Sequence, residues 1–411
     1  MPASGEPILS SIYPSHVVKL HPTGLLRSGL SRTSFRELVV PRVELERVTK
    51  IFDRPGDRPV RALSEVTLDV AGTRPFVIIG PSGSGKTTVL RLIAGLEMPT
   101  SGVIRIGDKV INDVPAKQRD VAMVFQSPAL YPHMSVYENI AFGLRLRGCA
   151  REETDQRVRG AAEKLGLAGC LQAKPMALSG GQRQRVSIAR AIVRRPSLLL
   201  FDEPLSQIDP SLRAQLRNEL SRLLQELGTT MVYVTHDQTE AMLVGSQVAV
   251  LRDGVVEQVG DPVHLYQNPA NLFVAGFIGS PGMNFFPGIL ISRGNRLMVQ
   301  SQKGLLVALD ASTAYRVETY AGGPVILGVR PEDIRLHGDP SVSAAKALLE
   351  GTVLAVQHVG AEVYLDVKAS PGESFTVRMS AGTRAPGQSC AFVMDLSRVH
   401  FFEPGSGKAI G

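Results

Sequence analysis

The chain has 411 residues, more than one hydrophobic core normally supports, so two or three domains are expected. Hydrophobic residues make up 44% of it and charged residues 20%, a balance that excludes a disordered or fibrous protein. The formal net charge is +7, but the basic residues are scattered and lack the aromatic platforms of a nucleic-acid groove. No nucleic-acid partner is therefore expected.

Hydropathy and cysteine content indicate the compartment. No apolar run is long enough to cross a bilayer, and the N-terminus has no apolar block of the kind found in secretory signals. The three cysteines (Cys149, Cys170 and Cys390) lie far apart and form neither a metal-binding pattern nor a disulfide framework. These features predict a cytosolic chain that can still dock on membrane proteins.

Ordered patterns begin only after residue 41. Residues 1–41 are rich in Ser, Pro and Arg, show no sustained periodicity and predict a flexible extension. Residues 43–48 alternate between apolar and polar like a half-buried strand, and Phe52 follows them. A loop rich in Pro, Gly and Asp over residues 53–59 predicts a hairpin or an insertion, and residues 62–70 predict the next strand.

The next segment carries a phosphate-binding signature: Gly80, Pro81, Ser82, Gly83, Ser84, Gly85, Lys86, Thr87 and Thr88. The apolar run at residues 76–79 before it is typical of a buried parallel strand, and residues 88–96 after it predict a helix. A turn from strand to helix directs backbone N–H groups and the helix dipole at one point, which suits an anion. Lys86 is expected to neutralise the β- and γ-phosphates of a nucleoside triphosphate, and Thr87 to offer its hydroxyl to Mg²⁺.

Two later apolar strands end in polar residues. Residues 198–201 are followed by Asp202 and Glu203, and residues 231–234 lead to His236. Because parallel strands end at the same edge of a sheet, these side chains should meet the phosphate loop in one crevice.

The expected roles of these residues follow from the chemistry of phosphate hydrolysis. Asp202 is expected to hold Mg²⁺, and Glu203 to accept the proton of the attacking water. His236 is expected to sense the γ-phosphate. Gln126, which follows a strand-like run at residues 121–125, is expected to reach the metal or the water.

The remaining patterns define the fold class. Residues 151–165, 183–193 and 210–227 predict helices, the last with Asp209 as its N-cap, and residues 248–251 predict another strand. Apolar strands alternating with helices indicate a parallel sheet covered on both faces. After about residue 279, short alternating runs between Gly- and Pro-bearing turns predict a small antiparallel barrel or sandwich.

In its order of motifs the chain resembles the ATP-binding cassette (ABC) ATPases. The matching stretches are Gly80–Thr88, Gln126, Leu178–Gln182, Leu198–Glu203, Ser206–Asp209 and His236, and the Leu-Ser-Gly-Gly-Gln element is nearly diagnostic. The resemblance implies that two such domains pair head to tail around two ATP molecules, and that Phe52 stacks on the base. Five residues would then contact the ATP that is held by the other subunit: Ser179, Gly180, Gly181, Gln182 and Asp209.

A narrower resemblance is to the ATPase subunits of carbohydrate importers of the maltose and glycerol-phosphate type. It is carried by residues 125–134, 202–206, 233–238, 273–284 and 328–333 and covers the chain from about residue 43. It implies an α/β ABC domain over residues 42–279, with a helical subdomain at about 127–190, and an all-β OB-type (TOBE-like) regulatory domain over residues 280–411.

The same resemblance implies partners and a location. Two membrane-spanning permease subunits would dock near Gln126–Tyr137, a solute-binding protein would act indirectly from outside, and the ATPase would lie peripherally on the cytoplasmic face of the inner membrane. The chain departs from the pattern at Phe52, where Tyr is common, and at Gln207 and Ile208, but keeps every group that does chemistry. An importer of polyamine, iron, sulfate or molybdate stays open as an alternative, as does a soluble ATP-dependent switch protein without a permease.

Overall fold

The computed structural model describes residues 41–411 apart from 54–55, 57, 295, 339–345, 371 and 381–383. The flexible extension predicted over residues 1–41 therefore lies, except for Pro41, outside the described residues. The helices are α1 (Lys86–Ala94), α2 (Val136–Leu146), α3 (Arg151–Lys164), α4 (Gly180–Ile192), α5 (Pro210–Leu227), α6 (Gln238–Val244), α7 (Pro262–Gln267), α8 (Leu272–Phe277) and α9 (Ala311–Val317).

The strands in the first part of the chain are β1 (Val43–Phe52), β2 (Val60–Val70), β3 (Phe76–Ile79), β4 (Ser101–Ile106), β5 (Lys109–Val110), β6 (Val121–Val124), β7 (Leu198–Asp202), β8 (Thr230–Thr235), β9 (Gln247–Arg252) and β10 (Val255–Gly260). The later strands are β11 (Asn284–Arg293), β12 (Arg296–Ser301), β13 (Leu306–Ala308), β14 (Pro324–Val329), β15 (Ile334–Leu336), β16 (Lys346–Val359), β17 (Glu362–Ala369), β18 (Ser374–Ser380), β19 (Ser389–Asp395), β20 (His400–Phe402) and β21 (Ala409–Ile410).

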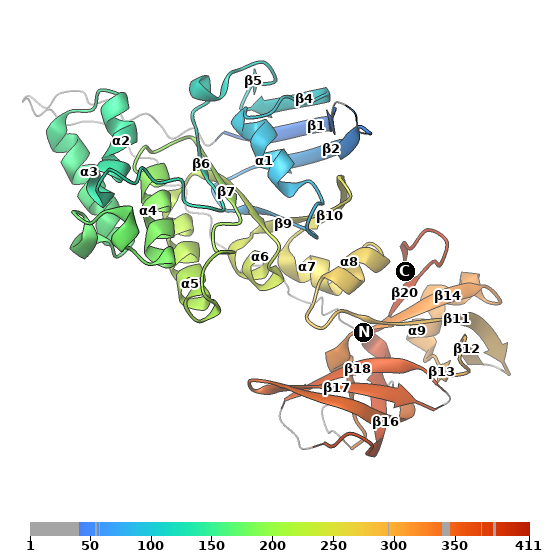
Figure 1. Ribbon diagram of the computed structural model, residues 1–411. Helices are drawn as coiled ribbons and strands as arrows, with labels where there is room; N and C mark the ends of the chain where they lie inside the picture. The colour runs from blue at the N-terminus through green and yellow to red at the C-terminus, as the bar shows by residue number, and fades with distance from the viewer. Residues whose placement is uncertain are drawn as a thin grey trace, which may run out of the picture. The chain divides into compact units, whose positions relative to one another are not determined.

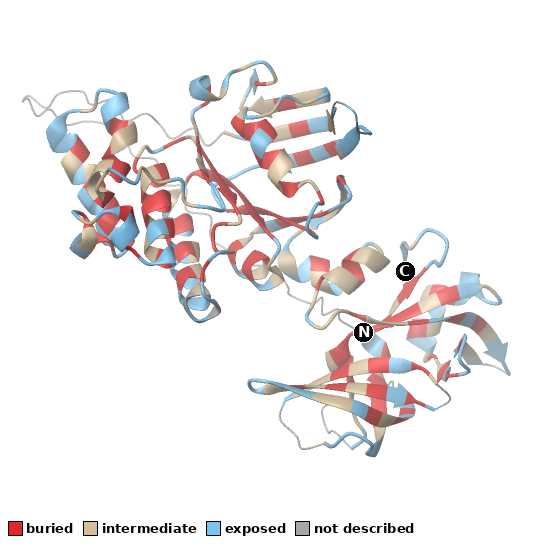
Figure 2. Ribbon diagram, viewed as in Figure 1, coloured by how far each residue is buried: buried red, intermediate tan, exposed pale blue. Residues whose placement is uncertain are grey.

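A six-stranded sheet in the order β10-β9-β3-β8-β7-β6 is the centre of residues 43–260 (Figure 1). Its strands β9, β3, β8, β7 and β6 run parallel, as expected, whereas β10 pairs antiparallel with β9. Every residue of β3, β7 and β8 is buried, so these strands are red along their whole length in Figure 2. Such complete burial requires a cover on both faces of the sheet.

The two faces of this sheet have different covers. Val77 and Ile79 pack into a core that also contains apolar residues of helices α2 to α6. Their neighbours Phe76 and Ile78 pack into a second core with α1 and the antiparallel sheet β2-β1-β4-β5. The alternation is the period of two that a strand imposes on its side chains.

Helix α1 begins two residues earlier than predicted, at Lys86, and ends at Ala94 instead of residue 96. Gly95 ends it, because this residue takes a left-handed φ of 76° and its N–H donates to the carbonyls of Arg91 and Leu92. Lys86 and Thr87 therefore lie in the first turn of the helix.

Arg119 ties the C-terminal end of α1 to the segment before β6. Its side chain is buried, and its guanidinium donates to the carbonyls of Leu92 (2.7 Å), Ile93 (2.8 Å), Val114 (2.7 Å) and Ile111 (2.5 Å). Burial lowers the pKa of this guanidinium. One cation thus donates to carbonyls at the end of α1 and in the segment before β6 at the same time, and it is the only donor to that of Ile93 among the described residues.

Asn139 holds the turn that precedes α2. Its buried amide donates to the carbonyls of Tyr131 (3.1 Å), Met134 (3.2 Å) and Ser135 (3.0 Å), and its carbonyl oxygen accepts from the N–H of Tyr131 (2.8 Å). Helix α2 itself begins at a capping box between Ser135 and Glu138. The turn at residues 131–135 is therefore held by its own backbone contacts to Asn139.

Residues 284–410 form two antiparallel sheets, β13-β12-β11-β14-β20-β21 and β15-β19-β16-β17-β18. Apolar side chains of both sheets, among them Phe286, Leu365 and Phe392, meet in one core. The predicted all-β architecture is confirmed, and the short helix α9, which begins after the N-cap Asp310, is an addition that the sequence patterns did not indicate.

Arg330 joins the segment of α7 and α8 to the end of β14. This side chain is only 2% exposed, and its guanidinium donates to the carbonyls of Tyr266 (2.8 Å), Ala275 (2.9 Å) and Ile278. The guanidinium carbon also lies 4.0 Å from the centroid of the Tyr266 ring, a cation–π contact. A single side chain thus ties both helices to the β-rich part of the chain.

Replacing Arg119 with Met should destabilise the fold around α1. The substitution keeps the apolar stem but removes a donor from four carbonyls, and among the described residues it leaves those of Ile93 and Val114 with none, so we expect a loss of about 3 kcal/mol in the free energy of unfolding. Urea unfolding followed by circular dichroism measures it, with the exposed neighbour in Lys117→Ala as the control. An unchanged midpoint in Arg119→Met would contradict this role of Arg119.

Candidate active site

The phosphate loop needs its glycines for steric reasons. Gly83 and Gly85 take φ values of 81° and 101°, which residues with a Cβ rarely adopt. A Cβ on Gly85 would in addition lie 2.6 Å from the carbonyl oxygen of Ala62 on β2. The sequence therefore fixes a narrow loop between β3 and α1.

Two polar groups of this loop are suited to an anion. The Lys86 ammonium is buried and donates to the carbonyls of Gly80 (2.9 Å) and Pro81 (2.8 Å). Burial lowers the pKa of Lys86, and the nearby carboxylates of Glu203 and Asp202 oppose that shift. The hydroxyl of Ser84 is buried without a hydrogen-bond partner among the described atoms. A phosphate oxygen is an acceptor that both groups can use.

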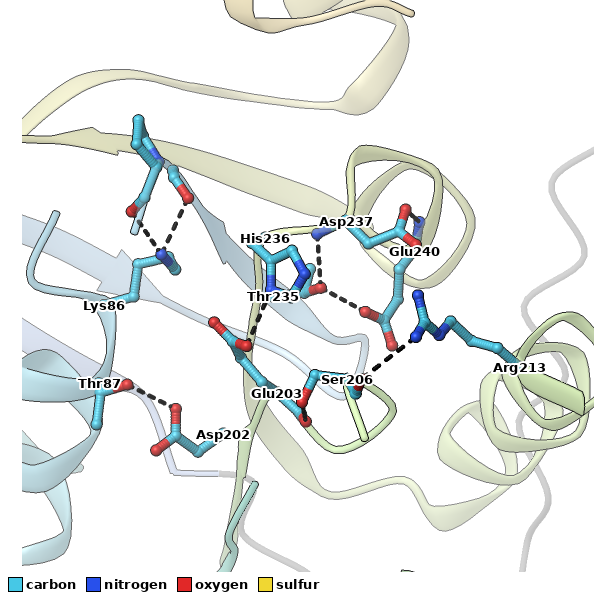
Figure 3. A network of polar contacts seen from close by, with 12 residues as sticks. Lys86, Thr87, Asp202, Glu203, Ser206, Arg213, Thr235, His236, Asp237 and Glu240 are labelled. Carbon is cyan, nitrogen blue, oxygen red and sulfur yellow. Dashed lines mark hydrogen bonds and ion pairs between the residues drawn. The ribbon is translucent and has the colours of Figure 1, made fainter. Parts of the chain in front are cut away.

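Asp202, the last residue of β7, lies against the start of α1. Its carboxylate accepts a hydrogen bond from the Thr87 hydroxyl at 2.8 Å (Figure 3). Burial raises the pKa of Asp202, and the Thr87 hydrogen bond acts in the opposite direction. A hydroxyl and a carboxylate oxygen side by side are the hard ligands that Mg²⁺ prefers, so this pair fits the ion.

Glu203 follows on the same strand end and meets His236. Its Oε2 lies 2.9 Å from Nδ1 of His236, which extends from the end of β8 (Figure 3). The backbone of Glu203 takes an unusual φ of 45°, and its N–H donates to the carbonyl of Val234 at 2.9 Å. Such strained positions persist where the surrounding structure fixes them, and they concentrate at functional sites.

A hydrogen-bond network behind His236 was not indicated by the sequence patterns. The buried carboxylate of Glu240 accepts hydrogen bonds from the hydroxyls of Tyr233 and Thr235. Asp237 caps the N–H of Glu240 at 3.1 Å. The spacing of Asp237 and Glu240 resembles a capping box, which would suggest a surface glutamate; the structure instead turns Glu240 inward.

Gln126 and Phe52 are the other predicted residues on this side of the molecule. Gln126 is exposed and follows β6, whose residue Val124 pairs with Phe201 of β7, so it lies beyond the same sheet edge as Asp202. Its side chain makes no hydrogen bond with the other site residues in the part of the chain that the structure describes. Phe52 is half-buried, and the Lys50 ammonium lies 4.6 Å from its ring centroid.

The residues predicted to act across a dimer lie at other places in the fold. Ser179 is exposed and caps α4: its hydroxyl accepts from the N–H of Gln182, and the Gln182 side chain accepts from the N–H of Ser179. Gly180 is exposed and Gly181 buried. No hydrogen bond between this element and the phosphate loop is present within the described residues.

Asp209 differs from the prediction in one respect. It stands at the N-cap position of α5, with Pro210 next, but its exposed side chain makes no capping hydrogen bond. Pro210 at the first helical position is not the cause, because Asp261 caps α7 ahead of Pro262 by accepting from the N–H of His264 at 2.9 Å.

Comparisons with known proteins agree with this geometry. A family model described as "ABC transporter" matches residues 63–206, one described as "MalK OB fold domain" matches residues 279–334, and one described as "TOBE domain" matches residues 327–402. An osmoprotective compounds uptake ATP-binding protein of Synechocystis is 46% identical over 362 residues, which cover 88% of this chain and 97% of that protein.

Two further relatives are similar over most of the chain. A trehalose/maltose import ATP-binding protein of Thermococcus litoralis is 45% identical over 376 residues, 90% of this chain and 99% of that protein. An uncharacterized ABC transporter ATP-binding protein of Bacillus subtilis is 43% identical over 351 residues, 85% of this chain and 95% of that protein. The chain belongs to the ABC transporter ATPases.

As a member of this family the chain is an ATPase, so the predicted resemblance, the ATP-hydrolysing activity and the ABC fold with an OB and TOBE region are confirmed. None of the helices in the described residues is long and apolar enough to span a membrane. In this ABC ATPase the structure brings Lys86, Thr87, Asp202, Glu203 and His236 together at one edge of the central sheet (Figure 3).

The buried carboxylate of Asp202 should cost stability. Burial raises the pKa of Asp202 in the folded chain. The fold is therefore most stable, with respect to this group, below the unfolded-state pKa, and it loses that stability as the pH rises through the folded-state pKa and the buried carboxyl ionises. Asp202→Asn, without nucleotide or Mg²⁺, is therefore expected to raise the free energy of unfolding at neutral pH. The gain should shrink as the pH falls through the folded-state pKa and should vanish only well below about 4, where the carboxyl is neutral in the unfolded state as well.

Urea unfolding at several pH values measures this difference. Asp253→Asn is the matched control, because the Asp253 side chain is 87% exposed. An Asp202→Asn variant that is less stable than the wild type at neutral pH would contradict the prediction, because it would show that the contacts of the carboxylate outweigh the free energy lost by burying its charge.

Proposed function

We propose that the chain is the ATP-hydrolysing subunit of an inner-membrane importer, and that its ATP-driven dimer closure energises uptake of a sugar or a glycerol-phosphate-type solute. One observation supports ATP hydrolysis most directly. The Lys86 loop, the Thr87–Asp202 pair and the Glu203–His236 pair lie together at the ends of β3, β7 and β8. The names of two relatives, which concern trehalose, maltose and osmoprotective compounds, support the class of solute.

Each residue of the site has a chemical role in this proposal. The amides of Gly80–Thr88, together with Lys86, bind the phosphates of ATP, and Thr87, Asp202 and Gln126 hold Mg²⁺, which would neutralise phosphate charge. Glu203 accepts a proton from the attacking water, while His236 and Gln126 sense the γ-phosphate. The half-buried ring of Phe52 stacks on the base.

The site is completed by a second copy of the chain or by a close relative. Ser179, Gly180, Gln182 and Asp209 are at least partly exposed, and among the described residues none of them makes a hydrogen bond with the phosphate loop of its own chain. Helix α4 is 13 residues long and presents its N-terminus at Ser179, a place where a helix can bind an anion. Two chains paired head to tail would bring each such element to the other's ATP.

Permease subunits would dock at Gln126–Tyr137. Within this segment Gln126, Ser127, Ala129, Pro132 and His133 are exposed, and the turn at residues 131–135 is held by hydrogen bonds to the buried Asn139. A preformed turn of this kind loses little conformational entropy when it accepts a helix of a membrane protein. We further propose a cytoplasmic, peripheral location and a domain boundary near residue 279, with the OB-type region after it in a regulatory role.

Glu203→Gln should abolish turnover and trap an ATP-bound dimer. The amide keeps the shape of the side chain but cannot accept the proton, so kcat is expected to fall by about 10²–10⁴-fold while ATP still binds. Steady-state ATPase assays measure the first effect and size-exclusion chromatography with ATP the second, with the exposed Glu226→Gln as the control. Hydrolysis at the wild-type rate by Glu203→Gln would refute the role of Glu203 as base.

Loss of the gene should abolish uptake of one solute class. In the source cell, we expect the deletion to stop uptake of labelled trehalose or maltose and to leave uptake of sulfate, molybdate, iron and polyamine intact. Wild-type chain, but not Glu203→Gln, should restore it, because import requires ATP hydrolysis. Loss of one of the other solutes would assign the importer to it, and unchanged uptake of all of them would favour a switch protein without a permease.

A further inference from the structure

Glu240 is a buried acid for which the proposed chemistry has no use. It lies on α6, is 4% exposed, and its carboxylate points toward the end of β8 behind His236 (Figure 3). Burial raises the pKa of Glu240, and the hydrogen bonds from the Thr235 and Tyr233 hydroxyls act in the opposite direction. An ionisable group in such a place reduces stability, so its presence suggests a task other than holding the fold together.

The contacts of Glu240 converge on the backbone around His236. Its carboxylate accepts from the Thr235 hydroxyl, and the oxygen of that hydroxyl accepts from the N–H of Asp237 at 3.0 Å. The Asp237 carboxylate in turn accepts from the N–H of Glu240 at 3.1 Å. The residues directly before and after His236 are thus held in one closed ring of hydrogen bonds.

A second contact anchors this ring in the sheet. The other oxygen of the Glu240 carboxylate accepts from the hydroxyl of Tyr233, which is fully buried in β8. The neighbouring residue Val234 accepts the N–H of Glu203 through its carbonyl. The backbone of Glu203 is therefore fixed to β8, the strand that leads to His236, and the Glu240 carboxylate links the Tyr233 and Thr235 hydroxyls of that strand.

We propose that Glu240 is a positioning residue for ATP hydrolysis: by holding Thr235 and Tyr233 it sets the place of the His236 imidazole against Glu203. The proposal rests on the roles assigned to Glu203 and His236. Misplacement of a catalytic side chain by about 1 Å can cost two orders of magnitude in rate, so even a small release of this backbone should be measurable.

The kinetic test compares Glu240→Ala with two matched variants. Glu240→Ala is expected to lower kcat per nucleotide-binding site about tenfold with little change in KM for ATP, because binding of the phosphates depends on the loop and not on His236. Glu240→Gln, which keeps one acceptor, should retain most of kcat. Thr239→Ala, an exposed neighbour on the same helix, should leave kcat unchanged. A kcat that is unchanged in Glu240→Ala overturns the proposal.

A double-mutant cycle separates positioning from general damage. If Glu240 acts through His236, then Glu240→Ala should lower kcat less than about twofold in a His236→Ala background. A full additional tenfold loss there would overturn the proposal. If His236→Ala alone leaves kcat unchanged, the assigned role of His236 fails, which is a different result from a failure of Glu240.

A spectroscopic measurement remains decisive even where activity becomes too low to measure. In chain labelled with ¹⁵N at its 8 histidines, the His236 ring signals are identified by their loss in His236→Gln. In Glu240→Ala these signals should shift and broaden as the imidazole loses its fixed orientation, whereas in Thr239→Ala they should stay in place. Unchanged His236 signals in Glu240→Ala would show that Glu240 does not position the imidazole.

Discussion

The register of three parallel strands is the constraint on which the site depends. Ile79 at the end of β3 pairs with Thr235 of β8, and Asp202 at the end of β7 pairs with Val234. The phosphate loop, the two acids and His236 consequently leave the sheet at the same level. A slip of one residue would turn Asp202 to the opposite face, away from Thr87, so the apolar packing that fixes the register also fixes the chemistry.

Much of this arrangement could be predicted, because the signals are local. Gly83 and Gly85 predict a loop whose backbone enters the left-handed region, as it does. The continuous apolar runs before the loop, before Asp202 and before His236 predict strands that are buried on both faces. The rule that parallel strands end at one edge then brings these residues together without any knowledge of distances. The limits of α1 were less accessible, since its start depends on the loop geometry and its end on the conformation of Gly95.

The buried polar side chains could not be predicted in this way. Arg, Asn and Glu are usually found on the surface, yet Arg119, Asn139 and Glu240 are buried. Nothing adjacent in the sequence shows that backbone carbonyls or hydroxyls will surround them. Their partners come from other turns and strands, so the tertiary structure decides that they are buried and satisfied. Asp209 is the opposite case: its sequence context favours a capping hydrogen bond, yet its side chain makes none.

Two buried charges of the site, those of Lys86 and Asp202, reduce the stability of the folded chain by itself. Lys86 and Asp202 both have pKa values shifted by burial toward the neutral form, so each charge is unfavourable for the chain alone. The carbonyls of Gly80 and Pro81 offer the Lys86 ammonium only partial charge, whereas a phosphate oxygen offers a full one. When a nucleotide phosphate replaces these carbonyls as the acceptor, the buried ammonium becomes more stable. Binding of the nucleotide therefore raises the free energy of unfolding of this edge of the fold.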